Sequence, residues 1–247
     1  MWDAIILDGP TEADLDLLEI RMHELYEVVD KVFIVESNRK QGYVNYVINL
    51  LLMQALDLFT GTINGTPKGY FFGDNRYDSR FSLFQYKIVY KAVPSPPPYS
   101  LRYSSPEAWS ERLRGEMTDL LRTRSSNTLR TPLVLFAEID EIPSAHTIRL
   151  LRDCVFPSPL HLQLRRFMYS FAWPIGWDSA RAQVHVWDEN SLPDAGPGVI
   201  DRVYTQYSHE LASDFALADA GWQCIHCDKK LDDILERMRG TLGIFFS

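Results

Sequence analysis

Two uninterrupted runs of hydrophobic residues, at positions 32–35 and 133–137, are the clearest pattern in the chain. Their short length and their β-branched and aromatic residues predict buried β-strands. Polar residues follow each run at once: Ser37 and Asn38 come after the first, and Glu138 comes after the second. Because an open α/β sheet binds its ligands at the carboxyl ends of its strands, both ends are candidate sites.

Apolar residues at helical spacing predict helices between the strands. The first helix is expected from about Thr11 to Val29, and Thr11 with Asp14 forms an N-cap arrangement at its start. Its apolar face consists of Leu15, Leu18, Met22 and Leu25. Further helices are expected at 106–123, 144–153 and 231–238, and further strands at 87–93 and 160–173. This alternation predicts a single α/β domain over residues 1–247, with a mostly parallel central sheet flanked by helices.

Composition and charge narrow the choice of partners. The 247 residues are 46% hydrophobic and 23% charged, which is ordinary for a globular domain. The formal net charge of −8 disfavours a nucleic-acid partner. A local site can still bind a small phosphorylated ligand, because its sign can differ from that of the whole surface.

The chain as given shows no targeting segment, because no basic N-terminal stretch precedes a long apolar run. The most apolar stretch, at 44–59, is interrupted by polar residues. It is also shorter than the ~20 residues that a membrane helix needs. Membrane association is therefore expected only through a segment that is not present in this chain.

The sharpest feature is the acidic cluster of Glu138, Asp140 and Glu141, which follows the second hydrophobic run. If the strand continues through it, Glu138 and Asp140 point the same way, since alternate side chains share a face. Two such carboxylates suit Mg²⁺ or Mn²⁺, which bind through carboxylates together with substrate phosphates. Acids are also common at solvated strand ends. Phosphohydrolases and nucleotidyltransferases use the same kind of metal site, so the cluster alone does not select a reaction.

Cys224 and Cys227 are separated by two residues, and Cys154 is the only other cysteine. The spacing allows a redox pair or half of a zinc site, but no second pair exists to complete a zinc site. A local disulfide or two packed thiols fit the sequence better.

Short motifs follow one another in a fixed order along nearly the whole chain. They include Asp140-Glu141-Ile142-Pro143, the segment 169–173, and Gly221-Trp222 before Cys224-x-x-Cys227. The others lie at 15–21, 24–25, 29–38, 59–61, 67–68, 80–81, 87–90 and 159–162. This ordered set resembles glycosyltransferase family seventeen. Its best-known members are β-1,4-mannosyl-glycoprotein 4-β-N-acetylglucosaminyltransferases, which add the bisecting sugar to N-glycans.

The resemblance implies a GT-A-like fold, a UDP-sugar donor, a divalent metal (Mn²⁺ or Mg²⁺) and transfer with inversion. The donor is expected to be UDP-N-acetylglucosamine, and the acceptor a mannose-containing glycan or glycoprotein. A location in the Golgi or another secretory-pathway lumen is implied as well.

The resemblance also assigns roles to residues. Glu138 and Asp140 match the family's acid-x-acid metal pair, although the family usually has Asp at the first of these positions. Glu36 and Ser37 are expected near the donor nucleotide. Lys68 is a candidate for contact with a donor phosphate, with simple solvation as the alternative.

Inversion needs a base that takes the proton of the acceptor hydroxyl. Glu141 is the candidate because it adjoins the metal pair, with Asp140 as the other catalytic residue. The alternative for Glu141 is support of the turn. Trp173 and Trp177 are candidates for stacking on an acceptor sugar. Trp177 is expected to be exposed, whereas packing in the core is favoured for Trp173.

Besides Glu138, three further places depart from the family pattern. Residues 41–58 have no counterpart, and we interpret them as an insertion beside the donor site. The family continues past Met238 with a histidine-containing segment that this chain lacks, so the natural C-terminus is expected to be missing. Gln223 stands where the family usually has His. A non-enzymatic alternative follows: a sugar-nucleotide-binding protein that has lost catalysis.

Overall fold

The computed structural model describes residues 1–38, 62–63, 66–67, 69–95, 106–125, 131–177, 182–187 and 215–227. The predictions for Lys68, for an insertion at 41–58, for a helix at 231–238 and for the C-terminus lie outside these residues and stay predictions.

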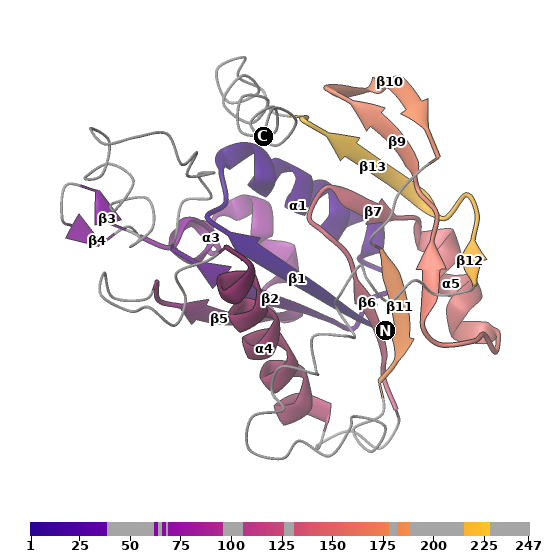
Figure 1. Ribbon diagram of the computed structural model, residues 1–247, viewed down its shortest axis with the longest axis horizontal. Coiled ribbons are helices and arrows are strands. Elements are labelled where there is room, and N and C mark those ends of the chain that lie inside the picture. The colour runs from indigo at the N-terminus through magenta and orange to yellow at the C-terminus, as the bar shows by residue number, and fades with distance from the viewer. Residues whose placement is uncertain are drawn as a thin grey trace.

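A seven-stranded sheet forms the centre of the molecule (Figure 1), in the order β12–β8–β11–β6–β1–β2–β5. Neighbouring strands are parallel except β11, which is antiparallel to both β6 and β8. The strands are β1 Trp2–Asp8, β2 Lys31–Ser37, β5 Ile88–Val93, β6 Leu133–Phe136, β8 Leu160–Leu162, β11 Gln183–Val186 and β12 Ala216–Leu217. The prediction of an α/β protein with a mostly parallel sheet is confirmed.

Strand β1, which lies inside the sheet between β6 and β2, is an element that the hydrophobic pattern alone does not predict. Asp3 interrupts its apolar run, yet Asp3 is itself buried, at 1% exposure. β1 pairs along its whole length with β2, from Trp2 opposite Lys31 to Asp8 opposite Ser37. Its other neighbour is β6, so β1 lies between the two strands that the hydrophobic runs predict.

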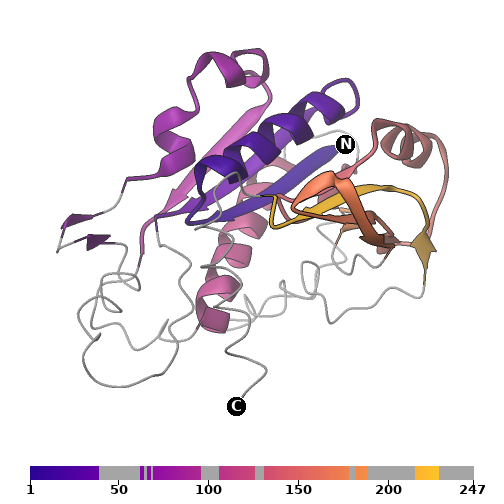
Figure 2. The same cartoon turned by 90° about the horizontal axis from the view of Figure 1, so that it is seen from above.

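Helices cover both faces of the sheet. They are α1 Glu12–Leu25, α3 Phe71–Asn75, α4 Pro106–Ser125 and α5 Ala145–Asp153, with a 3₁₀ helix, η1, at Ser79–Phe84. In Figure 2 the indigo α1 and the purple helices lie on one side of the strands, and the magenta α4 lies on the other. The predicted capping box of α1 is confirmed, because Thr11 and Asp14 each accept from the other's backbone N–H. α1 ends at Leu25, earlier than expected.

Each face of the sheet has its own apolar core. The core under α1 contains Ile5, Leu7, Leu15, Leu18, Ile34, Phe72, Phe81 and Ile148, all of them buried. The core under α4 contains Ala4, Phe33, Val35, Trp109, Leu113 and Met117. Successive residues of β1 and β2 therefore alternate between the two cores, as the pleat of a strand requires. Burial on both faces explains why these strands read as continuous hydrophobic runs.

A second, four-stranded sheet stands beside the first, in the order β10–β9–β13–β7. Its strands are β7 Glu141–Pro143, β9 Arg165–Met168, β10 Ser170–Gly176 and β13 Gly221–Ile225. β13 joins it by pairing antiparallel to β7 and parallel to β9. A short hairpin, β3 Thr62–Ile63 with β4 Thr66–Pro67, completes the described strands.

The prediction of a single strand at 160–173 is wrong. That segment forms β8, β9 and most of β10, and these belong to two different sheets. Tyr169, with a φ of 65°, reverses the chain between β9 and β10. The imperfect polar–apolar alternation in the sequence comes from these breaks.

Among the residues that the structure describes, no helix has both the length and the apolar character needed to cross a membrane.

A buried histidine gives the fold a testable pH dependence. His185 of β11 is 6% exposed, and its Nε2 lies 3.0 Å from Gln183 Oε1. Burial, with a smaller effect of nearby His161, lowers the pKa of His185 from 6.5 to about 4. Between pH 4 and pH 6.5 this histidine binds a proton in the unfolded chain but stays neutral in the folded protein. The free energy of unfolding is therefore unaffected by His185 above pH 6.5, and protonation of His185 in the unfolded chain lowers it as the pH drops toward 4.

We expect the free energy of unfolding, measured with urea, to fall by about 2 kcal/mol more in the wild type than in His185→Gln between pH 7 and pH 5. Comparison with the variant removes the effect of the carboxyl groups, which titrate in both proteins. An equal fall in the two proteins would contradict a neutral, buried His185.

Candidate functional site

The carboxyl ends of four parallel strands, β6, β1, β2 and β5, lie at one edge of the central sheet. Ligands bind at this edge in open α/β sheets. Asp8 ends β1, Ser37 ends β2, and Asn38 and Ser95 follow β2 and β5. The acidic cluster follows β6.

Asp8 is the centre of a hydrogen-bond network at this edge. Its Oδ1 accepts from the hydroxyl of Ser37 and, at 3.1 Å, from the indole Nε1 of Trp109 on α4. Ser37 is buried, so this hydroxyl links the ends of β1 and β2 from inside the protein. One carboxylate thus fixes the positions of two strands and a helix.

Asn38 and Ser95 extend the network to the next strand. Asn38 Oδ1 accepts from the backbone N–H of Ser95 at 2.9 Å and from its hydroxyl at 2.7 Å. Both residues are half-buried. Polar side chains therefore line the ends of three adjacent strands, which suits a ligand rich in hydroxyl groups and hydrogen-bonding ring atoms.

Glu36 does not lie where a residue that contacts the donor nucleotide is expected. Its side chain is fully buried, and its carboxylate accepts from Phe72 N at 2.8 Å, Gly73 N at 2.9 Å and Tyr90 Oη at 2.7 Å. Burial raises the pKa of Glu36, against the lowering effect of these three donors. The side chain holds the start of α3 against β2, so we assign it support of the site in place of direct contact with a donor.

The acidic cluster is a turn. β6 ends at Phe136, and the backbone N–H of Glu141 donates to the carbonyl of Glu138 at 3.1 Å before β7 begins. The expectation that the strand continues through Glu138 and Asp140, which would make their side chains share a face, is therefore wrong. We call residues 138–141 the acidic turn.

A buried arginine holds the acidic turn in place. Arg21 of α1 is fully buried, and its Nη1 donates to the carbonyl oxygens of Glu138 at 2.6 Å and Glu141 at 2.7 Å. Its Nε donates to Asp3 Oδ2 at 3.0 Å, and its Nη2 bonds to Asp3 Oδ1. The planar guanidinium group is suited to such a two-pronged contact with a carboxylate. One side chain thus joins α1, β1 and the acidic turn.

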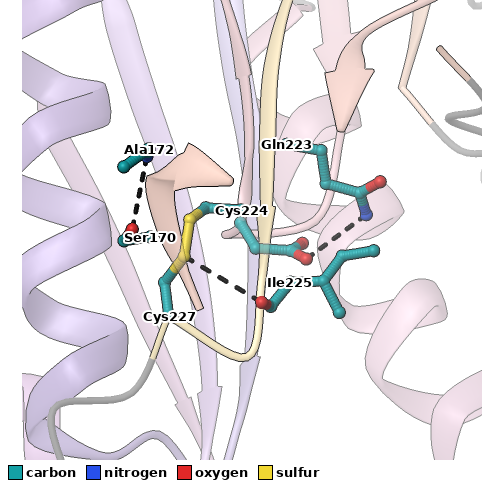
Figure 3. The surroundings of a disulfide bond; sticks show 7 residues. Ser170, Ala172, Gln223, Cys224, Ile225 and Cys227 are labelled. Atoms are coloured by element: carbon teal, nitrogen blue, oxygen red, sulfur yellow. Dashed lines mark hydrogen bonds between the residues drawn. A yellow bond between two sulfur atoms is a disulfide. The ribbon is translucent and has the colours of Figure 1, made fainter. Parts of the chain in front are cut away.

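Strand β13 holds Asp140 from the other side. The backbone N–H of Cys224 donates to the carbonyl of Asp140 at 3.0 Å, and Gln223 Nε2 lies 3.3 Å from Asp140 Oδ2. Cys224 also forms a disulfide with Cys227, so the predicted local disulfide is confirmed. Figure 3 shows Gln223 and the disulfide on opposite sides of β13.

Glu141 is too deeply buried for the predicted role of base. Its side chain is fully buried, and its Oε2 accepts from the backbone N–H of Glu138 at 2.9 Å. Its Oε1 has no hydrogen-bond partner among the described residues. Burial, and to a lesser extent the charges of Asp140 and Glu138, raises the pKa of Glu141 to about 8, although the Glu138 N–H lowers it. A carboxyl group in this position cannot reach an acceptor hydroxyl, so we assign Glu141 the alternative role of supporting the turn.

The carboxylates of the acidic turn suit only a metal site that the substrate completes. Within the described part of the chain, no group of three or more His, Cys, Asp or Glu residues could hold a metal ion. Glu138 and Asp140 are half-buried and Glu141 is enclosed. Two carboxylates fit an ion that completes its coordination with substrate phosphates and water, as Mg²⁺ does, and do not form a cage that binds metal alone.

A family model described as "Glycosyltransferase family 17" matches residues 1–242. The chain belongs to glycosyltransferase family 17. It is therefore a glycosyltransferase, and its reaction involves a sugar donor and an acceptor. A search of curated proteins and a search of solved structures each found no match.

In this family 17 chain the outer surface of the second sheet is rich in aromatic residues. Trp177 is exposed, as expected, and the guanidinium carbon of Arg165 lies 5.6 Å from the centroid of its ring. Trp173 is 68% exposed, so its expected place in the core is wrong. It belongs to β10, an edge strand all of whose residues are exposed.

Several residues of the site are ones that sequence reasoning missed, namely Asp8, Trp109 and Arg21. Asp8 had a usable signal, because Asp8-Gly9-Pro10 is a turn sequence directly after an apolar run. Gly9 has a φ of 65°, which favours glycine. Arg21 and Trp109 had none, since each lies within a helix whose pattern does not distinguish it from a surface residue.

The Arg21 contact predicts a large loss of stability when it is broken. Removing one partner of a buried ion pair leaves the other charge buried and costs about 3–5 kcal/mol. We expect urea denaturation of Arg21→Met to show a loss of this size. The double variant Asp3→Leu/Arg21→Met should recover part of it, because no unpaired charge then remains.

Arg80→Met is the matched control. Arg80 contacts Asp16 at 3.1 Å, but both side chains are 23% exposed, so we expect a loss below about 1 kcal/mol. Equal losses in Arg21→Met and Arg80→Met would contradict the role given to the buried pair.

Proposed function

We propose that the chain is an inverting N-acetylglucosaminyltransferase with a GT-A-like fold, which transfers N-acetylglucosamine from UDP-N-acetylglucosamine to a mannose-containing glycan. The observation that carries the proposal is the acidic turn at the carboxyl edge of the sheet, next to the polar ends of β1, β2 and β5. Family membership supports sugar transfer over phosphate hydrolysis or nucleotidyl transfer by the same carboxylates. The seven-stranded, mostly parallel sheet supports the GT-A-like assignment.

The donor would lie along the edge of the sheet. Its uridine would bind at the ends of β1 and β2, where Asp8, Ser37 and Asn38 are located. Its phosphates would then face the acidic turn after the adjacent strand, β6. Lys68 stays a candidate for contact with a phosphate.

Asp140 and Glu138 would hold Mn²⁺ or Mg²⁺ together with the two phosphates. The metal would neutralise the charge of the departing UDP. Arg21 and Glu141 would keep the turn in the shape that presents these carboxylates, because they bind its backbone. Gln223 would orient the Asp140 carboxylate.

We place the protein in the lumen of the secretory pathway, with the Golgi as the expected compartment. The Cys224–Cys227 disulfide supports this placement, since disulfides persist in oxidising compartments.

Calorimetric titration with UDP-N-acetylglucosamine tests the proposal. We expect binding in the presence of Mn²⁺ that is lost on chelation. In Asp140→Asn the affinity with Mn²⁺ should fall at least about tenfold, because one of two metal carboxylates is gone.

Asp119→Asn, on the exposed side of α4, is the control and should bind like the wild type. Absence of donor binding in folded wild-type protein would contradict the proposed donor. Donor binding that is unchanged by chelation, or unchanged in Asp140→Asn, would contradict the proposed metal site. Metal-dependent binding without transfer to any mannose-containing glycan would favour the non-enzymatic alternative.

A further inference from the structure

Strand β10, at the outer edge of the second sheet, exposes large hydrophobic side chains. All seven of its residues are exposed. Phe171, Trp173, Ile175 and Trp177 are between 42% and 68% exposed. In Figure 1 the strand forms the outer edge of the second sheet. Contiguous apolar surface of this kind marks a binding site more often than scattered exposed residues do.

A hollow of about 340 Å³ continues this surface toward α1. Ile20 and Glu24 of α1 line one side, and Ile142, Phe167, Phe171 and Trp222 of the second sheet line the other. The size is at the low end for small-ligand pockets. Glu24 is half-buried and has one carboxylate oxygen bonded to the N–H of Ala145 at 2.7 Å.

The hollow and β10 belong to one face of the second sheet. Trp222 of β13 is directly opposite Ile142 on one side and Arg165 on the other, and directly opposite residues share a face. Arg165 in turn lies over the ring of Trp177. We call Phe171, Trp177 and Trp222, with the hollow, the aromatic surface.

The edge of β10 is poorly suited to pairing with another chain. Pro174 lies within the strand and has no N–H to donate, and the pairing with β9 shifts register on both sides of it. Proline and bulges are devices by which edge strands avoid pairing. Recognition here must therefore use the side chains.

Those side chains suit carbohydrate. Flat aromatic faces pack against the C–H groups of a sugar ring, while polar groups at their margins bond its hydroxyls. Among the described residues, the carboxylate of Glu24 and the guanidinium group of Arg165 lie at the margins of the aromatic surface. Neither sign of charge dominates, so the surface fits a neutral ligand with many hydroxyl groups.

The aromatic surface lies on the opposite face of β13 from the Asp140 carboxylate. Gln223, whose amide bonds Asp140, is next to Trp222 on β13, and successive side chains of a strand point to opposite faces. A sugar bound on this surface is therefore separated from the reacting centre by the thickness of the sheet.

We propose that the aromatic surface binds the part of the acceptor glycan that is remote from the reacting hydroxyl. The inference rests on the proposed function in one respect, because it takes the ligand to be the acceptor. It implies that the protein prefers a branched oligosaccharide to a single sugar, since only a large acceptor reaches both faces of the sheet.

Titration of the full chain with an N-glycan core oligosaccharide, followed by saturation-transfer NMR and calorimetry, tests the proposal. Trp177→Ala and Trp222→Ala should each weaken binding about fivefold or more, the effect of losing one aromatic contact. Tyr77→Ala is the control: Tyr77 is 71% exposed and lies between α3 and η1, so it should bind like the wild type. Free mannose should bind far more weakly than the oligosaccharide to all four proteins.

Oligosaccharide affinity unchanged in both tryptophan variants, or absent in the wild type, would overturn the proposal. So would self-association of the wild type that Trp177→Ala abolishes, because the surface would then bind a second copy.

Titration with UDP-N-acetylglucosamine and Mn²⁺ reports on the proposed function separately and should be equal in wild type and both tryptophan variants. Loss of donor binding in a tryptophan variant would show a damaged fold. In that case Trp177→Phe and Trp222→Phe, which keep an aromatic face, should bind both ligands nearly as the wild type does, and failure of both to bind the oligosaccharide would overturn the proposal.

Discussion

The arrangement of the site depends on one buried cation. Arg21 is on the helix that covers β1, and its guanidinium group reaches Asp3 in β1 and two carbonyl oxygens of the acidic turn. Desolvation of a charged guanidinium group is costly, so a buried arginine is stable only where its N–H groups are hydrogen-bonded. Four hydrogen bonds satisfy it here. The contact fixes the distance between the first strand, the first helix and the turn after β6, and with it the position of the candidate metal carboxylates.

Acidic residues at the strand ends divide into two groups by burial. Asp8, Glu138 and Asp140 are half-buried and border the edge where ligands bind. Glu36 and Glu141 are fully buried and bind backbone N–H groups, Glu36 at the start of α3 and Glu141 within the acidic turn. Both kinds follow a hydrophobic run and look alike in the sequence. The difference is whether a neighbouring backbone supplies donors to a carboxylate that has lost water.

Strand β13 connects the two surfaces to which we assign function. Its Gln223 contacts Asp140, and its neighbour Trp222 faces the hollow beside α1. The alternation of side chains along one strand thus serves a donor site on one face and a proposed acceptor surface on the other. The disulfide at the end of this strand holds Cys224, whose N–H binds the Asp140 carbonyl. A displacement of β13 would therefore move residues on both faces of the second sheet.

The sequence by itself determined the class of the fold, the family and most of the local elements. Hydrophobic runs predicted β2 and β6, helical spacing predicted α1 and α4, and ordered motifs predicted the family, because these signals are local in the chain. Tertiary structure alone decided that β1 lies between β6 and β2 and that the acidic cluster is a turn. It also decided which acids are enclosed and that Trp173 is exposed. Each of these depends on contacts between residues far apart in sequence, such as Arg21 with Glu138, or on the absence of a neighbouring described strand beside β10. No local pattern carries that information, since the same residue types at the same spacing fit either outcome.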